Sequence, residues 1–286
     1  MNLGELALTC FAYGAMAYDD SLGQFSRRVQ GDTDLSKEEH RLALLHWLNQ
    51  WQCRQFSLAY HDLASAGLLE WHEEFGSTLP AKDKHLWEVP ESTVEEYAGV
   101  FDILAKKVAC HRDTGRPAAT VSGAAATASG AAPGAAPASN KVAVTFGPTA
   151  AAKILFVLRP KIFVAWDEPI RAGLHYDGSG RSYVGFLIRL REELLDLREQ
   201  CRAFSFHLED LPDAIGRPLS TPAQLLDEYY WATVTRGVVA PTRKQLARWL
   251  EWYTPPDLDA TMAIDQPKRR FVAPPWPEDE ASGEVA

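Results

Sequence analysis

Residues 146–171 read FGPTAAAKILFVLRPKIFVAWDEPIR, and this sequence predicts two helices joined by a short apolar turn. Gly147 and Pro148 favour the start of a helix, because glycine tolerates the conformation of a cap and proline costs least in the first turn. Arg159 and Pro160 should end it, since proline disfavours helical geometry in the residue before it. The three alanines favour the helix and allow another backbone to approach closely, so we expect this helix to be buried.

The second helix of the segment is expected to begin after Asp167. An aspartate is a preferred N-cap residue, and Glu168 and Pro169 suit the first helical turn. Ile170 and Leu174 continue on one face. The segment therefore predicts a helix, a turn, a carboxylate and a second helix, in that order.

This order resembles the active-site segment of the helix-hairpin-helix superfamily of DNA glycosylases, over roughly residues 146–174. In that family a buried helix leads through a short apolar turn to an aspartate at the head of the next helix, and Asp167 matches this aspartate. The resemblance implies a mainly α, two-lobed fold. It also implies an enzyme, without a cofactor, that hydrolyses the N-glycosidic bond of a damaged or modified base flipped out of DNA.

The segment departs from the family pattern at two places. The family's hairpin usually has two glycines separated by one residue, and here only Gly147 is present. Members that also cut the DNA strand carry a lysine at the start of the buried helix, where this chain has alanines, and Lys153 follows about one turn later. We therefore expect a monofunctional glycosylase. Lys153 is kept as a second candidate catalytic residue, which could form a Schiff base only if it is buried and loses its proton.

Several residues near this segment are candidates for binding DNA. The net charge of the chain is −9, but residues 141–202 contain ten Lys and Arg against seven Asp and Glu, so the basic residues gather in the centre of the sequence. The candidates for phosphate contacts are Gly147, Thr149, Lys161, Arg171 and Arg181. The alternative is that these charges form an ordinary solvated helical surface.

Trp166 and His175 are candidates for the pocket that would hold an extruded base. An aromatic face stacks on any base, and a histidine can donate a hydrogen bond. The alternatives are that Trp166 belongs to the hydrophobic core and that His175 lies in a surface loop.

The composition excludes several classes of protein. The four cysteines are far apart and the histidines lack ligand spacing, so no metal site or disulfide framework is expected. No apolar run has the length of a membrane span, and we expect a cytoplasmic monomer with DNA as its partner. We divide the chain into an N-terminal helical lobe (1–116), an Ala/Gly/Pro/Ser-rich linker or loop (117–140), a C-terminal helical lobe with the active site (141–265) and a Pro-rich acidic tail (266–286).

Outside the central segment the pattern predicts helices almost everywhere. The sequence breaks a first helix at residues 19–23, begins a second at the capping box of Ser36, and runs a fourth from Ser92 or Thr93 to about Cys110. Further helices are expected over 56–75, 182–204, from Thr221, and over 242–253. The one alternating stretch, 141–146, is too short to carry a sheet by itself.

Two other functions fit the same residues. Asp167 could simply cap a helix in a non-catalytic module that binds nucleic acid or protein. A nuclease of another helical type is the third possibility, and it would need magnesium. Within the glycosylase hypothesis, the resemblance also permits the excision of modified bases from phage DNA in bacterial defence.

Overall fold

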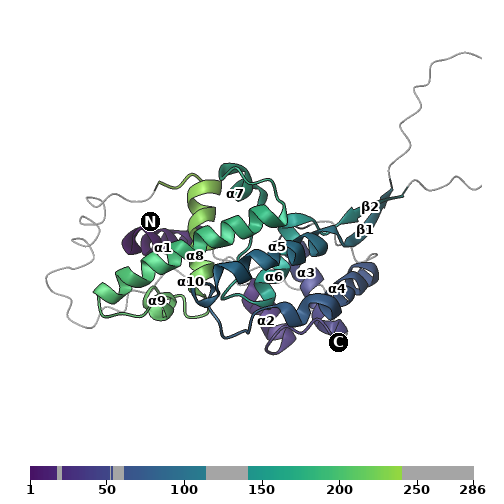
Figure 1. Ribbon diagram of the computed structural model, residues 1–286, viewed down its shortest axis with the longest axis horizontal. Coiled ribbons are helices and arrows are strands. Elements are labelled where there is room, and N and C mark those ends of the chain that lie inside the picture. The colour runs from purple at the N-terminus through teal and green to yellow at the C-terminus, as the bar shows by residue number, and fades with distance from the viewer. Residues whose placement is uncertain (18–20, 52, 54–60, 114–140, 240–286) are drawn as a thin grey trace, which may run out of the picture.

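A computed structural model describes residues 1–17, 21–51, 53, 61–113 and 141–239, and this part of the chain is mainly helical (Figure 1). The prediction of a mainly α protein is therefore confirmed. Within the described residues, no helix is both long and apolar enough to cross a membrane. The principal elements are α1 (Leu3–Ala17), α2 (Ser21–Val29), α3 (Glu38–Gln50), α4 (His61–Phe75), α5 (Glu91–Lys106), β1 (Val108–Asp113), β2 (Lys141–Thr145), α6 (Gly147–Leu158), α7 (Glu168–Gly173), α8 (Gly180–Ala203), α9 (Leu211–Ala214) and α10 (Pro222–Tyr230), which continues into a π-helical turn, η5 (Trp231–Thr235).

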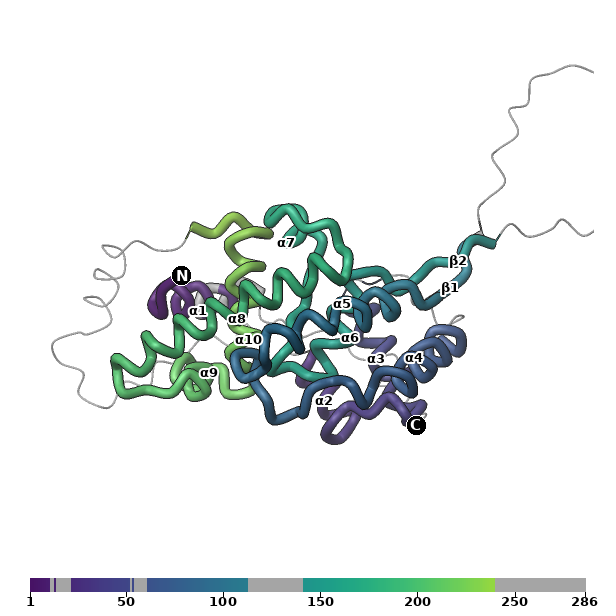
Figure 2. The backbone as a smooth tube through the Cα atoms, viewed as in Figure 1, coloured from purple at the N-terminus to yellow at the C-terminus, as the bar shows by residue number. Residues whose placement is uncertain are grey.

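The central helix of the fold is α6, whose predicted limits are confirmed. Every residue from Ala150 to Leu158 is buried, and the helix packs against α3 and α5. One continuous hydrophobic core extends from Leu6 in α1 to Tyr230 in α10. The segments on either side of residues 114–140 therefore share this core, and α1 lies against α10 although the two are far apart in sequence (Figure 2).

Helices α5 and α8 pack closely, and a glycine makes this possible. A Cβ atom built on Gly180 would lie 2.0 Å from the carbonyl oxygen of Ala98, so no other residue fits there without a shift of the backbone. The amide of Gly180 also donates to Asp102 Oδ1 at 2.6 Å. This contact fixes the first turn of α8 against α5.

A small antiparallel hairpin of β1 and β2 extends from the edge of the helical body (Figure 1). Val108 pairs with Thr145 and Asp113 pairs with Lys141. The prediction that the fourth helix reaches Cys110 is therefore wrong, because α5 ends at Lys106 and Cys110 lies in β1. Residues 141–145 of the alternating stretch do form a strand, β2, whose partner is this preceding segment.

Two expectations near the N-terminus are also corrected. The chain is helical again from Ser21, within the stretch predicted to be a break. Helix α3 begins at Glu38 after Lys37, and the side chain of Ser36 bonds to Asp34 Oδ1 instead of capping the helix. The predicted helix over 242–253, the Ala/Gly-rich linker and the acidic tail fall outside the described residues.

The close contact at Gly180 predicts a large effect of one methyl group. Gly180→Ala should lower the free energy of unfolding by about 2–3 kcal/mol, because the new Cβ meets backbone of α5 that cannot move alone. Gly99→Ala is the matched control: Gly99 lies within α5 with nothing within 4 Å of its Cβ position, so alanine should stabilise by about 0.5–1 kcal/mol. Urea unfolding of both variants measures the difference, and an unchanged midpoint for Gly180→Ala would contradict this packing.

Candidate active site

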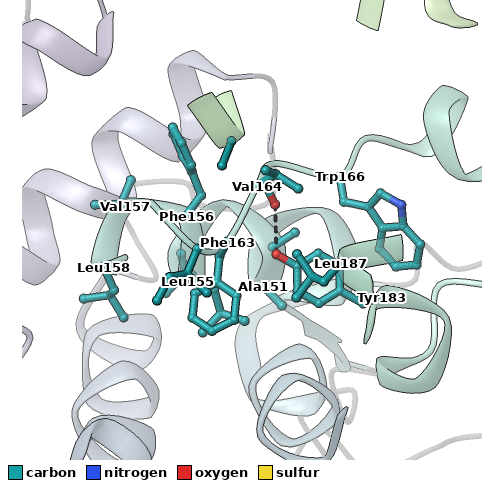
Figure 3. Packing of buried hydrophobic residues seen from close by; sticks show 14 of the residues in the cluster. Ala151, Leu155, Phe156, Val157, Leu158, Phe163, Val164, Trp166, Tyr183 and Leu187 are labelled. Atoms are coloured by element: carbon teal, nitrogen blue, oxygen red, sulfur yellow. Dashed lines mark hydrogen bonds between the residues drawn. The ribbon is translucent and has the colours of Figure 1, made fainter. Parts of the chain in front are cut away.

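The connection between α6 and α7 is buried and held at several points. Residues 162–166 are buried, and the amides of Ile162 and Phe163 both donate to the carbonyl of Arg159, at 2.9 and 3.0 Å. The hydroxyl of Tyr183 on α8 donates to the carbonyl of Val164 at 2.9 Å, as the dashed line in Figure 3 shows. The backbone that leads to Asp167 is therefore fixed before the carboxylate is reached.

Trp166 lies in the hydrophobic core. Of the two places that the sequence left open for this residue, a base pocket and the core, the structure therefore shows the core. The side chain of Trp166 has no exposed surface, and its ring lies 5.3 Å from Tyr183, 6.0 Å from Phe186 and 6.1 Å from Phe101. Its indole Nε1 has no hydrogen-bond partner among the described residues. Trp166 thus anchors the connection, and its ring is enclosed by aromatic side chains of the core.

Asp167 occupies the N-cap position of α7, as predicted, but its side chain does not cap the helix. The residue has extended backbone geometry, with φ −75° and ψ 157°, and the carboxylate accepts no hydrogen bond from the first turn. Oδ1 instead lies 3.0 Å from Nζ of Lys153, and 33% of the side chain is exposed. The carboxylate is therefore held by an ion pair while part of it stays accessible from solvent.

Lys153 is the buried partner of this ion pair. Only 4% of its side chain is exposed, and its ammonium also donates to the carbonyl of Trp51 at 3.0 Å. The ammonium lies 4.9 Å from the centre of the Trp51 ring, within the range of a cation–π interaction. The lysine does not reach for the surface as most lysines do. Although Lys153 comes late in α6 relative to the family pattern, the fold places it beside Asp167.

A second acidic residue, Asp227 on α10, is near enough to Asp167 and Lys153 to feel their charges. Burial raises the pKa of this carboxyl well above its usual range, the charges of Asp167 and Glu228 raise it further, and Lys153 opposes them. A part of the residue reaches solvent. Within the described part of the chain the Asp227 side chain has no hydrogen bond and no ion pair, and the charge of Lys153 only partly offsets the rise of its pKa.

The segment that follows α10 packs on α7. The turn η5 continues α10 and contacts α7, and a Cβ atom on Gly173 would lie 2.4 Å from Cγ1 of Val234 in that turn. The absence of a side chain at Gly173 therefore lets η5 approach α7, the helix that Asp167 begins.

Cys53, which follows α3, also lies near Lys153 and Asp167. Cys53 is buried, its amide donates to the carbonyl of Leu48 at 2.9 Å, and its thiol is near enough to Lys153 and Asp167 to feel their charges. Burial raises the pKa of the Cys53 thiol, so it stays neutral and is not a thiolate nucleophile. Among the described residues no group of three or more His, Cys, Asp and Glu side chains could hold a metal ion. These residues thus offer one ammonium and two carboxyl groups.

Three of the predicted phosphate contacts lie together near the N-terminus of α6. Gly147 has a φ of +72°, which favours glycine, and the space around its Cβ position is open. Arg171 donates to Thr149 Oγ1 at 2.9 Å and to the carbonyl of Trp166 at 2.6 Å. Arg171 therefore ties the start of α6 to the connection before Asp167, and its hydrogen bonds hold the protein together before any phosphate is bound.

The remaining predicted site residues are more widely spread. Lys161 follows α6, so the length of that helix, about 18 Å for twelve residues, separates it from Gly147. Arg181 is exposed in the first turn of α8. His175 is exposed in the loop after α7 and has a φ of 62°.

The sequence interpretation missed Trp51, Cys53 and Asp227. Trp51 and Cys53 follow a helix whose pattern predicts only a place in the core, and the hydrogen bond from Lys153 to the Trp51 carbonyl spans about a hundred residues. A signal for Asp227 was present, because Asp227 and Glu228 interrupt an otherwise apolar helix that carries Leu225, Leu226 and Tyr230. Burying an acidic side chain in such a stretch is costly unless it is paired or has a functional role.

Comparisons of the chain with family models, with curated proteins and with solved structures give no match.

The ion pair between Lys153 and Asp167 predicts a strong energetic coupling. In a double-mutant cycle of Lys153→Met and Asp167→Asn, we expect a coupling free energy of about 1–2 kcal/mol, because Asp167→Asn leaves a buried ammonium with one carbonyl partner. Arg202 and Glu199, an exposed pair on α8, are the matched control. Their cycle, Arg202→Met with Glu199→Gln, should give less than about 0.5 kcal/mol. Equal coupling in the two cycles, measured by urea unfolding, is the outcome that contradicts the assignment.

Proposed function

We propose that this protein is a DNA glycosylase, which hydrolyses the N-glycosidic bond of a damaged or modified base flipped out of the duplex. The observation that carries the proposal is the state of Asp167. Its carboxylate does not cap α7, is one-third exposed, and is held at 3.0 Å from the buried ammonium of Lys153. A carboxylate that served only the helix would bond to the amides of the first turn.

The chemistry of base release suits such a group. When the bond between base and sugar breaks, positive charge develops on the deoxyribose. A fixed carboxylate in a partly desolvated site stabilises that charge and can accept a proton from the attacking water. Lys153 holds the Asp167 carboxylate in place by the ion pair. The hydrogen-bonded connection of residues 159–166 fixes α6, which carries Lys153, relative to α7, which Asp167 begins.

The proposal that DNA is the substrate rests on the resemblance and on the groups around Gly147. The space around the Cβ position of Gly147, at the start of α6, is open, and the basic residues of the chain gather in the central segment. Arg171 already has two hydrogen-bond acceptors in the protein, so it contributes its charge to this surface and orders the start of α6. Arg181 on α8 is free to reach a phosphate because it is exposed.

The position of Lys153 favours a second candidate activity, strand cleavage after base excision. An amine that attacks C1′ of the sugar would form a Schiff base with the opened deoxyribose. Lys153 is buried next to a carboxylate that could receive its proton, although the sequence spacing alone argued against this role. Reduction with borohydride distinguishes the two activities, because only a Schiff base is trapped as a covalent protein–DNA adduct.

Release of free base from DNA tests the proposal. Duplex oligonucleotides that each contain one modified base, such as uracil, hypoxanthine, 8-oxoguanine, an alkylated purine or hydroxymethylated cytosine, are incubated with the protein in the presence of a chelator. We expect the wild type to release at least one of these bases. Asp167→Asn should release it at least about 100-fold more slowly, since it removes the charge that stabilises the transition state.

The control for this experiment is the neighbouring residue. Glu168 is exposed in the first turn of α7, and Glu168→Gln should keep the rate of the wild type. DNA binding, measured by fluorescence anisotropy, should change little in both variants. If the wild type binds DNA and releases no base from any duplex, the non-catalytic binding module is the better description. DNA cleavage that stops on addition of the chelator would instead indicate a metal-dependent nuclease.

A further inference from the structure

We propose that the hairpin of β1 and β2 binds duplex DNA through the phosphate groups of its backbone. This inference rests on the proposed function, in which DNA is the substrate, and adds to it a surface outside the residues around Asp167. The hairpin holds DNA of any sequence, whereas the residues around Asp167 act on a single nucleotide.

The shape of the hairpin suits a groove of DNA. It projects from the helical body (Figure 1), and every residue of β2 except Val144 is exposed. Val142 has 52% of its surface exposed, and Arg112 in β1 is exposed as well. The projecting end therefore adds little to the core. A two-stranded ribbon of this kind is narrow enough to enter the major groove of B-DNA, which is about 12 Å wide.

The charges of the hairpin are almost all positive. Residues 106–113 and 141–145 contain four Lys and Arg against one acidic residue, Asp113, in a chain whose net charge is −9. The basic residues are Lys106, Lys107, Arg112 and Lys141. Residues 114–140, which join the two strands in the sequence, contain no acidic residue. A local excess of positive charge on a projecting element is complementary to the phosphate backbone of a nucleic acid.

The two basic residues at the projecting end are available to a partner. Arg112 and Lys141 are both exposed, and among the side chains that the structure describes no acidic one pairs with either of them. Arg112 lies opposite Val142, and Lys141 lies opposite Asp113 on the next pair of the ladder. Successive pairs of a ladder point to opposite faces. Each face therefore carries one cation, which suits a ribbon that lies between the two phosphate backbones of a groove.

The base of the hairpin is fixed in the protein. Ala109 and Cys110 are buried, and β1 packs against α4. The amide of the buried Phe146 donates to the carbonyl of Lys107 at 3.0 Å, and the Lys107 ammonium pairs with Glu70 of α4 at 2.9 Å. An element with a fixed base loses little conformational freedom when a partner binds, so more of its interaction energy contributes to affinity.

The hairpin also leads directly into the helix that carries Lys153. Strand β2 ends at Thr145, and α6 begins at Gly147, one of the proposed phosphate contacts. Lys153 is six residues further along α6, which corresponds to about 9 Å. This distance equals about three base pairs of duplex at 3.4 Å each. One duplex can therefore contact the hairpin and also reach the residues around Asp167.

Duplex DNA suits the hairpin better than other nucleic acids do. The major groove of duplex RNA is deep and narrow, and protein side chains do not read it, whereas the major groove of B-DNA admits a ribbon. Proteins that bind single strands use aromatic side chains on which the bases stack. Neither β1 nor β2 contains a Phe, Tyr or Trp. The hairpin therefore offers charge and shape to a duplex and no stacking surface to a single strand.

The test is the affinity of the full-length protein for an unmodified DNA duplex, measured by fluorescence anisotropy at several salt concentrations. The wild type should bind, and the double variant Arg112→Ala with Lys141→Ala should bind at least about tenfold more weakly at ~0.1 M salt. Because two phosphate contacts are lost, the slope of log affinity against log salt should become shallower by about 2. The double variant Arg112→Lys with Lys141→Arg keeps both charges and should keep the slope of the wild type.

A second pair of surface lysines provides the matched control. Lys82 and Lys84 are exposed in the loop before Leu86, and Lys82 already pairs with Asp32. The double variant Lys82→Ala with Lys84→Ala loses as much charge and should keep the affinity and the slope of the wild type. All of these side chains are exposed, so every variant should unfold at the urea midpoint of the wild type.

The outcomes separate this inference from the proposed function. If the wild type binds no duplex DNA, or if Arg112→Ala with Lys141→Ala binds as tightly as the wild type, the role of the hairpin is wrong. Equal affinity for duplex RNA of the same sequence also overturns it, because duplex RNA offers the hairpin no groove. Base release is measured independently with the modified duplexes. If the hairpin variant loses DNA binding and the wild type releases no base, the hairpin inference stands and the glycosylase fails.

Discussion

The ion pair of Lys153 and Asp167 is the interaction on which the proposed site depends. An ammonium that is almost completely buried needs oxygen partners, and Lys153 has two, the Asp167 carboxylate and the Trp51 carbonyl. These contacts draw together the middle of α6, the start of α7 and the end of α3. They also explain why the Asp167 side chain does not cap its own helix, since the carboxylate is turned toward the lysine.

The rest of the fold makes this pair rigid. Helix α6 is buried along most of its length, and the connection that follows is tied to α8 through Tyr183 and to α7 through Arg171. The rings around Trp166 fill the space beneath the connection. A catalytic carboxylate gains from such support, because a group that is already in place needs little reorganisation when charge develops beside it.

The sequence was informative where local rules act and uninformative where distant segments meet. Gly147, Pro148 and Pro160 set the limits of α6, and the place of Asp167 before α7 followed from capping preferences. The inward direction of Lys153 did not follow, because a lysine on a helix normally extends to solvent. The strand from Val108 to Asp113 was missed since its partner lies beyond residues 114–140. Asp227 is sixty residues from Asp167, so the effect of one charge on the other has no local sequence signal, although an acidic pair in an apolar helix is itself unusual.

The central claim is that the Asp167 carboxylate faces a place where a cationic sugar can sit. The most direct measurement compares two duplexes that differ at one nucleotide, a pyrrolidine analogue that carries a positive charge at the position of the sugar and a neutral tetrahydrofuran analogue. The wild type should bind the cationic duplex at least about tenfold more tightly, and Asp167→Asn should lose most of this preference. Equal affinity of the wild type for the two duplexes would contradict the account, because it would mean that no carboxylate meets the sugar.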